Sequence, residues 1–185
     1  MFYYAGHGTQ VAGRNYLIPV DANLFSNESL KKEAFNLDYL LNGLNSINSN
    51  ANIIILDACR NMPFSQLASN SLTRSLGSSN SRGVIAKMEE ELSSGLSALK
   101  APDNTLISFS TAPGTVAEDG YGANSNFTKA LAREISKSNI GIIELFTNTN
   151  RAVKRATGNS QQPWMTSNLT EQMKLNVKQN NTISW

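Results

Sequence analysis

The stretch "IIILDACRN", residues Ile53–Asn61, decides the fold class, because it is an apolar run that ends at the only cysteine, Cys59. Two other runs, "MFYYA" (1–5) and "TLISFSTA" (105–112), have similar length and composition. Short apolar runs of this kind predict strands that are buried on both faces. We therefore expect three buried strands, at 1–5, 52–58 and 105–112.

Segments with apolar residues at helical spacing lie between the first two runs and after the third. This spacing predicts helices at 36–47, with Asn36 as the N-cap, at 124–137, and at 142–158, where Gly158 suits the C-terminal stop. Short extended segments follow at 164–169 and 173–177. Strands that alternate with helices predict an α/β fold with a parallel sheet and helices on its faces. The expected helix stripes are Leu37, Leu40, Leu41, Leu44 and Ile47; Phe127, Ala130, Leu131 and Ile135; and Ile142, Leu145, Phe146, Val153 and Ala156.

The middle of the chain differs from its surroundings. Residues 65–83 are rich in serine and asparagine, which is typical of a flexible linker. Residues 84–100 predict a short amphipathic helix through Met88, Leu92, Leu96 and Leu99, interrupted by Gly95.

Composition excludes several classes of protein. A chain of 185 residues with 40% hydrophobic and 16% charged residues predicts one globular domain, and a net charge of +2 gives no reason to expect a nucleic-acid or membrane partner. One cysteine cannot form an internal disulfide, and no run reaches the roughly 18 apolar residues that span a bilayer. We expect a soluble, cytoplasmic protein.

The only histidine, His7, follows the first predicted strand, as Cys59 follows the second. Ligands of parallel α/β sheets bind at the carboxyl ends of the strands, and neighbouring strands lie about 4.8 Å apart. If these strands are neighbours, the two residues form a nucleophile and its base, and the amides of Gly8 and Cys59 face a developing oxyanion. Taken singly, a strand-end cysteine is also explained as an inert small hydrophobe, and the histidine as a satisfied polar group.

The segments "FYYAGHGTQVAGRNYLIPVDA" and "IILDACRNMPF" resemble the caspase-like peptidases, specifically the bacterial and metacaspase-like branch. The caspase signature places its cysteine about 50 residues after a histidine. The resemblance continues through "LISFSTAPGTVAEDGYGANSNFTKAL" and "QQPWMTSNLTEQMKLN". It implies a three-layer αβα fold with a mostly parallel sheet, with His7 as the base and Cys59 as the nucleophile.

The same resemblance divides the chain. It implies a large-subunit-like part at 1–64, an inter-subunit linker at 65–100 and a small-subunit-like part at 101–178, which together make one domain. Caspase-like sheets have six strands in the order 2-1-3-4-5-6, and this sequence begins at the third. The first two strands of the family are therefore expected to be missing, which leaves an apolar strand as an open edge.

Departures from the caspase pattern concern specificity. Where caspases carry a glutamine two residues before the cysteine, this chain has Asp57, as metacaspases and paracaspases do, and those enzymes cleave after basic residues. Asp119 falls where caspases carry a pocket arginine, and Glu118 precedes it. A carboxylate pocket recognises arginine or lysine by charge pairing. The alternatives are that Asp57 bonds to loop amides and that Glu118 and Asp119 lie in a solvated loop.

Arg74 and Arg82 lie in the predicted linker, where a protease with basic specificity cuts its own chain. The alternative is that they only keep the linker soluble. No cofactor or metal site is predicted. Metacaspases often need calcium, so the resemblance allows calcium as an activator, but the candidate ligands Asp103, Glu118 and Asp119 lack the regular spacing of a calcium loop.

The leading hypothesis is thus a cysteine endopeptidase that acts on polypeptides after arginine or lysine. A second is a truncated, non-catalytic binding or scaffold module, and a weaker third is a thiol hydrolase of small amides. The sequence leaves the oligomeric state and the natural substrate open.

Overall fold

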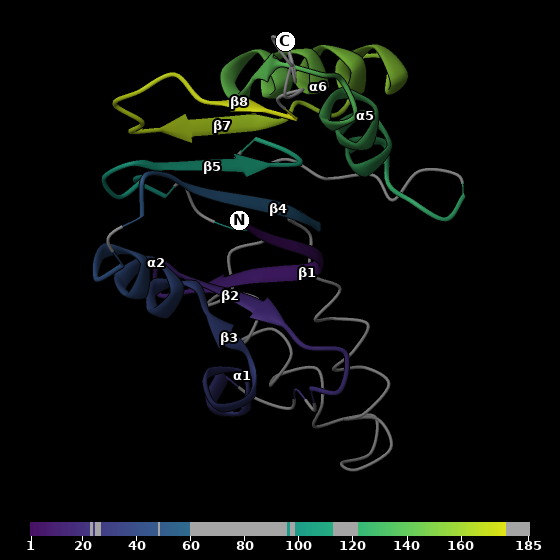
Figure 1. Cartoon of the computed structure of the whole chain (residues 1–185). Helices are drawn as coiled ribbons and strands as arrows, with labels where there is room; N and C mark the ends of the chain where they lie inside the picture. The colour runs from purple at the N-terminus through teal and green to yellow at the C-terminus, as the bar shows by residue number, and fades with distance from the viewer. Residues whose placement is uncertain are drawn as a thin grey trace, which may run out of the picture.

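A six-stranded sheet forms the centre of the protein, as the computed structural model in Figure 1 shows. Its strands lie in the order β3-β2-β1-β4-β5-β7, and β6 pairs with β8 in a separate two-stranded ladder. The structure describes residues 1–22, 24, 27–47, 49–59, 96, 99–112 and 122–176. The strands are β1 Phe2–Val11, β2 Arg14–Ile18, β3 Phe35–Asn36, β4 Asn52–Cys59, β5 Thr105–Phe109, β6 Ile140–Gly141, β7 Trp164–Ser167 and β8 Lys174–Leu175.

The centre of the sheet is parallel, as predicted. β4 pairs in parallel with β1 on one side and with β5 on the other, whereas β2, β3 and β7 are added antiparallel. Along β4, Ile53 and Ile55 belong to one core cluster, and Ile54 and Leu56 belong to another on the opposite face. A strand buried on both faces must be apolar at every position, which explains the unbroken run in the sequence.

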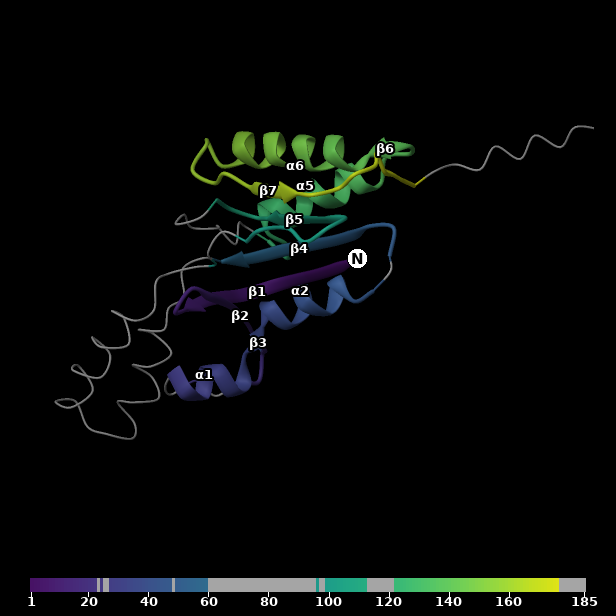
Figure 2. The ribbon, with the colours of Figure 1, turned by 90° about the vertical axis from the view of Figure 1, so that its left-hand side faces the viewer.

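Helices α5 (Asn126–Ile135) and α6 (Ile142–Ala156) cover one face of the sheet (Figures 1 and 2). Phe127, Leu145 and Phe146 are buried there against Ile55 and Leu106. Both predicted helices and their stripes are confirmed except at the last position. Ala156, the last residue of α6, is exposed.

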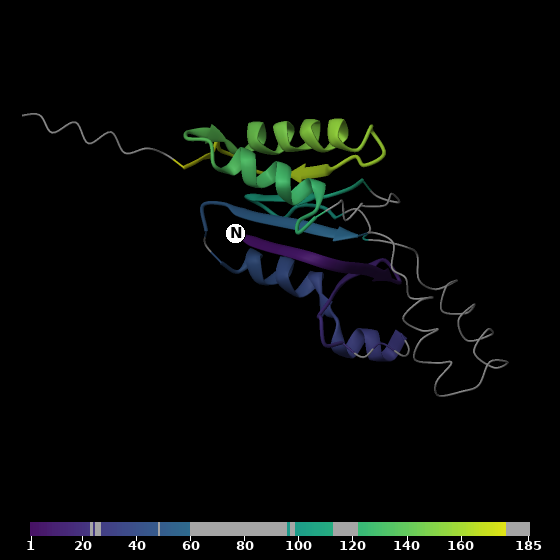
Figure 3. The ribbon, with the colours of Figure 1, turned by 90° about the vertical axis from the view of Figure 1, so that its right-hand side faces the viewer.

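Helix α2 (Leu37–Asn45) covers the opposite face and completes the three layers that the resemblance implies (Figures 2 and 3). Leu37 and Leu41 are buried against the strands. Asn36 is the predicted N-cap, and its side-chain oxygen accepts a hydrogen bond of 2.9 Å from the amide of Asp38. An N-cap of this type satisfies one of the donors that the first helical turn leaves free.

The polypeptide between the first two predicted elements holds structure that the sequence patterns did not predict. β1 continues beyond the predicted limit of residue 5 to Val11, turns at Ala12 and Gly13, and pairs with β2. Helix α1 (Asn27–Glu33) then packs beside this hairpin in a smaller core cluster that includes Tyr16 and Leu30. Residues 6–11 of β1 belong to a partly polar hairpin, so they lack the apolar run that marks a buried strand.

The third predicted strand is shorter than expected. β5 ends at Phe109, whereas the apolar pattern continues to Ala112. Ser110 and Thr111 are fully buried nevertheless, so the chain remains buried for two residues after the end of the strand. The short extended segments near the end are confirmed as β7 and β8.

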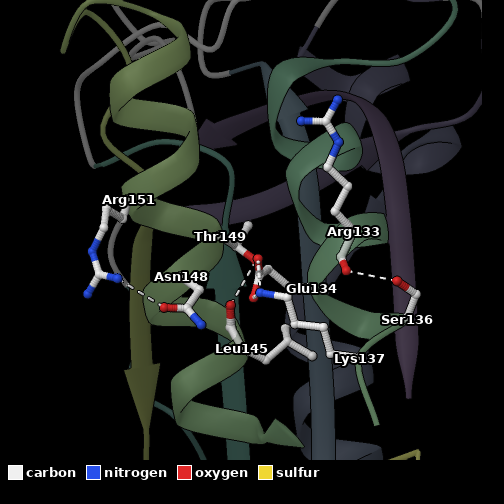
Figure 4. A network of polar contacts seen from close by, with 8 residues as sticks. All are labelled: Arg133, Glu134, Ser136, Lys137, Leu145, Asn148, Thr149 and Arg151. Carbon is white, nitrogen blue, oxygen red and sulfur yellow. Dashed lines mark hydrogen bonds and ion pairs between the residues drawn. The ribbon is translucent and has the colours of Figure 1, made fainter.

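Helices α5 and α6 carry local polar contacts, drawn in Figure 4. Lys137, which follows α5, forms an ion pair of 2.6 Å with Glu134. The buried Thr149 hydroxyl donates to the carbonyl of Leu145, four residues earlier in α6, at 2.9 Å. An ion pair between side chains three residues apart contributes only a few tenths of a kcal/mol. These contacts lie within the helical layer and involve no residue at the end of a strand.

Two predictions concern residues that the structure leaves undescribed. The linker at 65–83 and most of the helix at 84–100 fall there, apart from Leu96, Leu99 and Lys100. Leu96 is buried in the cluster beneath α2. Among the described residues, no helix has both the length and the hydropathy to cross a bilayer.

Candidate active site

His7 lies at the point where β1 changes its partner. Residues Phe2–His7 pair in parallel with β4, and residues His7–Val11 pair antiparallel with β2, so that His7 belongs to both ladders. Its side chain is exposed. The sequence analysis placed His7 beyond the strand end. This is corrected: His7 is inside β1, and only the parallel pairing ends at it.

Cys59 is the register partner of His7. It is the last residue of β4, where the sequence analysis placed it just beyond the strand, and its Cα is paired with that of His7 across the parallel ladder. The arrowheads of β1 and β4 lie side by side at the same end of the sheet in Figures 2 and 3. Two positions far apart in the sequence therefore meet at the carboxyl end of two neighbouring parallel strands, at the interstrand spacing of about 4.8 Å.

Tyr4 ties the backbone of His7 to strand β2. Its hydroxyl lies 2.8 Å from the His7 carbonyl and 2.8 Å from the Ile18 carbonyl, and it accepts a bond of 3.2 Å from the Ile18 amide. A phenol has one proton, so the two carbonyls share it. The hydroxyl thus links β1 and β2 at His7 and Ile18, where the pairing of these two strands begins.

The two glycines that flank His7 have a packing role. A Cβ on Gly6 would lie 2.7 Å from the Tyr4 hydroxyl oxygen, and one on Gly8 would lie 3.0 Å from Leu96. The space at both positions is filled by side chains of this chain. Gly8 is buried opposite Leu17 in the antiparallel ladder.

Burial raises the pKa of the Tyr4 phenol above its ordinary value of 10.0, and its hydrogen bonds with the backbone of Ile18 and His7 oppose that rise. A raised pKa in the folded state adds stability that is present below pH 10 and is lost as the pH rises through the folded value. We expect Tyr4→Phe to lower the free energy of unfolding at pH 7 by about 1 kcal/mol, through the lost hydrogen bonds. We also expect it to make the alkaline loss of stability shallower.

Urea unfolding at pH 7 and at intervals up to pH 11.5 measures both effects of the Tyr4 substitution. Tyr39→Phe is the matched control, because the Tyr39 side chain is 74% exposed on α2. Parallel curves of stability against pH for wild type and Tyr4→Phe would contradict the prediction.

Asp57 precedes Cys59 by two positions on β4 and is paired with Ala5 of β1. Its side chain is 8% exposed. One carboxylate oxygen, Oδ2, accepts hydrogen bonds from the hydroxyls of Ser125 and Thr128, each at 2.5 Å. Ser125 is the N-cap of α5 and also accepts from the Thr128 amide at 2.9 Å. The carboxylate is therefore held against the first turn of α5.

Of the remaining candidate residues, only Asp103 lies in the part of the chain that the structure describes. Arg74, Arg82, Glu118 and Asp119 lie outside the described residues. Asp103 precedes β5 and accepts a hydrogen bond of 2.9 Å from the Asn168 side chain. This is the amino end of a strand parallel to β4, opposite the end that holds Cys59. Within the described ranges, no group of three or more His, Cys, Asp or Glu side chains could hold a metal ion.

A polar hollow of about 770 Å³ also lies at that amino end of the sheet. It is lined by residues of α2, such as Asn42, and by residues at the start of β4 or before β5, among them Asn52, Asp103 and Asn104. Ligands of parallel sheets bind at the carboxyl ends, so this hollow is not the candidate site.

Sequence reasoning missed Tyr4, Ser125 and Thr128. A tyrosine two residues before a glycine on a strand places its ring over that glycine, since alternate residues share a face. A serine such as Ser125 directly before an apolar helical stripe is typical of an N-cap. No local pattern in the sequence, however, connects either hydroxyl with Asp57.

The chain matches the model of a known family. The family model described as the caspase domain, peptidase family C14, matches residues 1–174 and so includes every described element up to the first residue of β8. A search of curated proteins found no match.

Proposed function

The chain belongs to the caspase-domain family of cysteine peptidases, and from this premise we propose that it is an endopeptidase that cuts polypeptides after arginine or lysine. Cys59 is the nucleophile and His7 is its base. The observation that carries the proposal is the strand register, which pairs the Cα of His7 with that of Cys59.

The chemistry requires such a pairing. A free thiol is only a few per cent ionised at neutral pH, and an adjacent imidazole raises the thiolate fraction by accepting its proton. The thiolate attacks the peptide carbonyl and forms an acyl-enzyme, while the imidazolium gives the proton to the leaving amine. Water, deprotonated by the same imidazole, then hydrolyses the thioester and restores the thiol.

The tetrahedral intermediates carry a negative oxygen. We assign its stabilisation to the backbone amides of Gly8 and Cys59. A donor placed at such an oxyanion contributes about 3 kcal/mol to lowering the barrier.

Asp57 is assigned to recognition of the residue before the cut. Its carboxylate is negatively charged, it lies on the strand that carries Cys59, and its Oδ1 makes no hydrogen bond with the described residues. Glu118 and Asp119 are proposed as further acidic groups of the same pocket. A buried carboxylate discriminates strongly in favour of a cationic side chain and against an anionic one.

A set of fluorogenic peptides that differ only in the last residue, arginine, lysine or aspartate, tests the proposal. We expect cleavage after the two basic residues, at least about 100-fold faster than after aspartate. The assay is run with added calcium and with a chelator, which tests calcium activation at the same time. Preference for aspartate would overturn the role of Asp57.

Labelling with a thiol-reactive peptide ketone separates this function from that of a non-catalytic module of the same family. An assembled dyad is alkylated much faster than an isolated cysteine, because its thiolate fraction is higher. Labelling of Cys59 at the rate of free cysteine would favour the scaffold or binding module.

A further inference from the structure

The hydrogen bonds at Asp57 are unevenly distributed over its two oxygens. Ser125, before α5, and Thr128, in its first turn, both donate to Oδ2 at 2.5 Å. Each carboxylate oxygen has about two lone-pair sites. Oδ2 is therefore fully occupied by the protein itself, and Oδ1 makes no hydrogen bond with the described residues.

The proton positions in this cluster follow from its connectivity. The Ser125 hydroxyl accepts from the Thr128 amide at 2.9 Å, so that its own proton goes to Asp57. The Thr128 hydroxyl gives its only proton to Asp57, so Tyr3, whose hydroxyl lies 2.7 Å away, donates to Thr128. Three elements, β1, β4 and α5, thereby orient one carboxylate.

Arginine and lysine make different demands on a carboxylate. A guanidinium binds best through two parallel hydrogen bonds, one to each oxygen, whereas an ammonium group is a compact point charge that one oxygen can bind. Because both lone-pair sites of Oδ2 are occupied, a substrate guanidinium cannot form hydrogen bonds with both oxygens of Asp57.

We propose that Ser125 and Thr128 make Asp57 a one-oxygen acceptor, and that the enzyme consequently prefers lysine over arginine before the scissile bond. The proposal rests on the proposed function, in which Asp57 binds that side chain. Ser125 and Thr128 are positioning residues, because they act on the substrate only through the carboxylate.

Thr128→Val tests the inference, since valine has nearly the same shape as threonine and lacks only the hydroxyl. The measured quantity is the ratio of kcat/KM for two peptides that differ only in lysine or arginine at the last position. We expect wild type to favour lysine, and Thr128→Val to shift the ratio towards arginine by about fivefold, because Oδ2 becomes available. Thr128→Ser, which keeps the hydroxyl, should restore the wild-type ratio.

Ser136→Ala is the matched control. It removes a hydroxyl at the other end of α5, where Ser136 donates only to the Arg133 carbonyl at 2.8 Å, as Figure 4 shows. We expect no change in the lysine-to-arginine ratio. If Thr128→Val does not fold, Ser125→Ala replaces it, because it removes the other hydroxyl that donates to Oδ2. A smaller shift in the same direction is expected.

Binding of the same two peptides to Cys59→Ala protein, measured by calorimetry, gives the ratio without chemistry. A wild-type preference for arginine, or a ratio that Thr128→Val leaves within twofold, overturns this inference while basic specificity stands. Absence of both cleavage and binding for basic peptides overturns the proposed function as well, and the two failures are thus distinguished.

Discussion

We expect His7→Ala and Cys59→Ala each to lower kcat/KM on a basic peptide by about 10⁴-fold, and the double variant to be no worse than either single variant. This is expected because the proton transfer and the attack are one concerted task, so that removal of either member leaves the other without a function. The register pairing of the two residues is the structural basis. Initial rates at matched concentrations of folded protein measure the effect.

Two controls accompany the dyad prediction. Since the His7 side chain is exposed, its loss should leave the urea midpoint close to that of wild type. If the enzyme cuts its own linker, wild type yields fragments that end at Arg74 or Arg82, and Cys59→Ala yields only the intact chain. Multiplicative losses in the double variant, or identical fragments from both proteins, would contradict the prediction.

Asp57→Asn is expected to lower kcat/KM on lysine and arginine peptides by about 10² to 10³-fold, because a buried charge pair with the substrate is removed. The substitution keeps the shape of the side chain. Alkylation of Cys59 by uncharged iodoacetamide should proceed at the wild-type rate, since the dyad does not depend on the pocket.

The same variant separates recognition from structure. Asp57 also accepts hydrogen bonds from Ser125 and Thr128, so a purely structural carboxylate would show its loss chiefly in stability. Thermal unfolding of Asp57→Asn is therefore measured beside its kinetics. A lowered Tm with unchanged cleavage of basic peptides would remove Asp57 from the substrate pocket.

The parts of the fold that the sequence predicts are those with a strong local signal. The apolar run that contains Ile53–Leu56 marks β4 because both faces of that strand are buried, and Asn36 marks the start of α2 because its side chain caps the helix. The hairpin of β1 and β2 has no comparable signal. Its turn places Ala12 at φ 50° and Gly13 at φ 76°, and alanine is not the residue that this turn type favours.

The candidate site was predicted in part for a related reason. His7 and Cys59 were found from their positions beside apolar runs and from the resemblance. The partners of Asp57 lie 68 and 71 residues further along the chain and approach only when α5 packs on the sheet. Periodicity reports the face of an element, and it carries no information about which distant helix terminus that face meets.

In the proposed mechanism, the double pairing of His7 has a consequence for the energetics of turnover. A histidine on an irregular loop loses backbone freedom each time a substrate binds, and that entropy opposes catalysis. Here the main chain is joined to β4 on one side and to β2 on the other, with the Tyr4 hydroxyl at the junction. The ordering of this residue is completed during folding, so substrate binding need not include it.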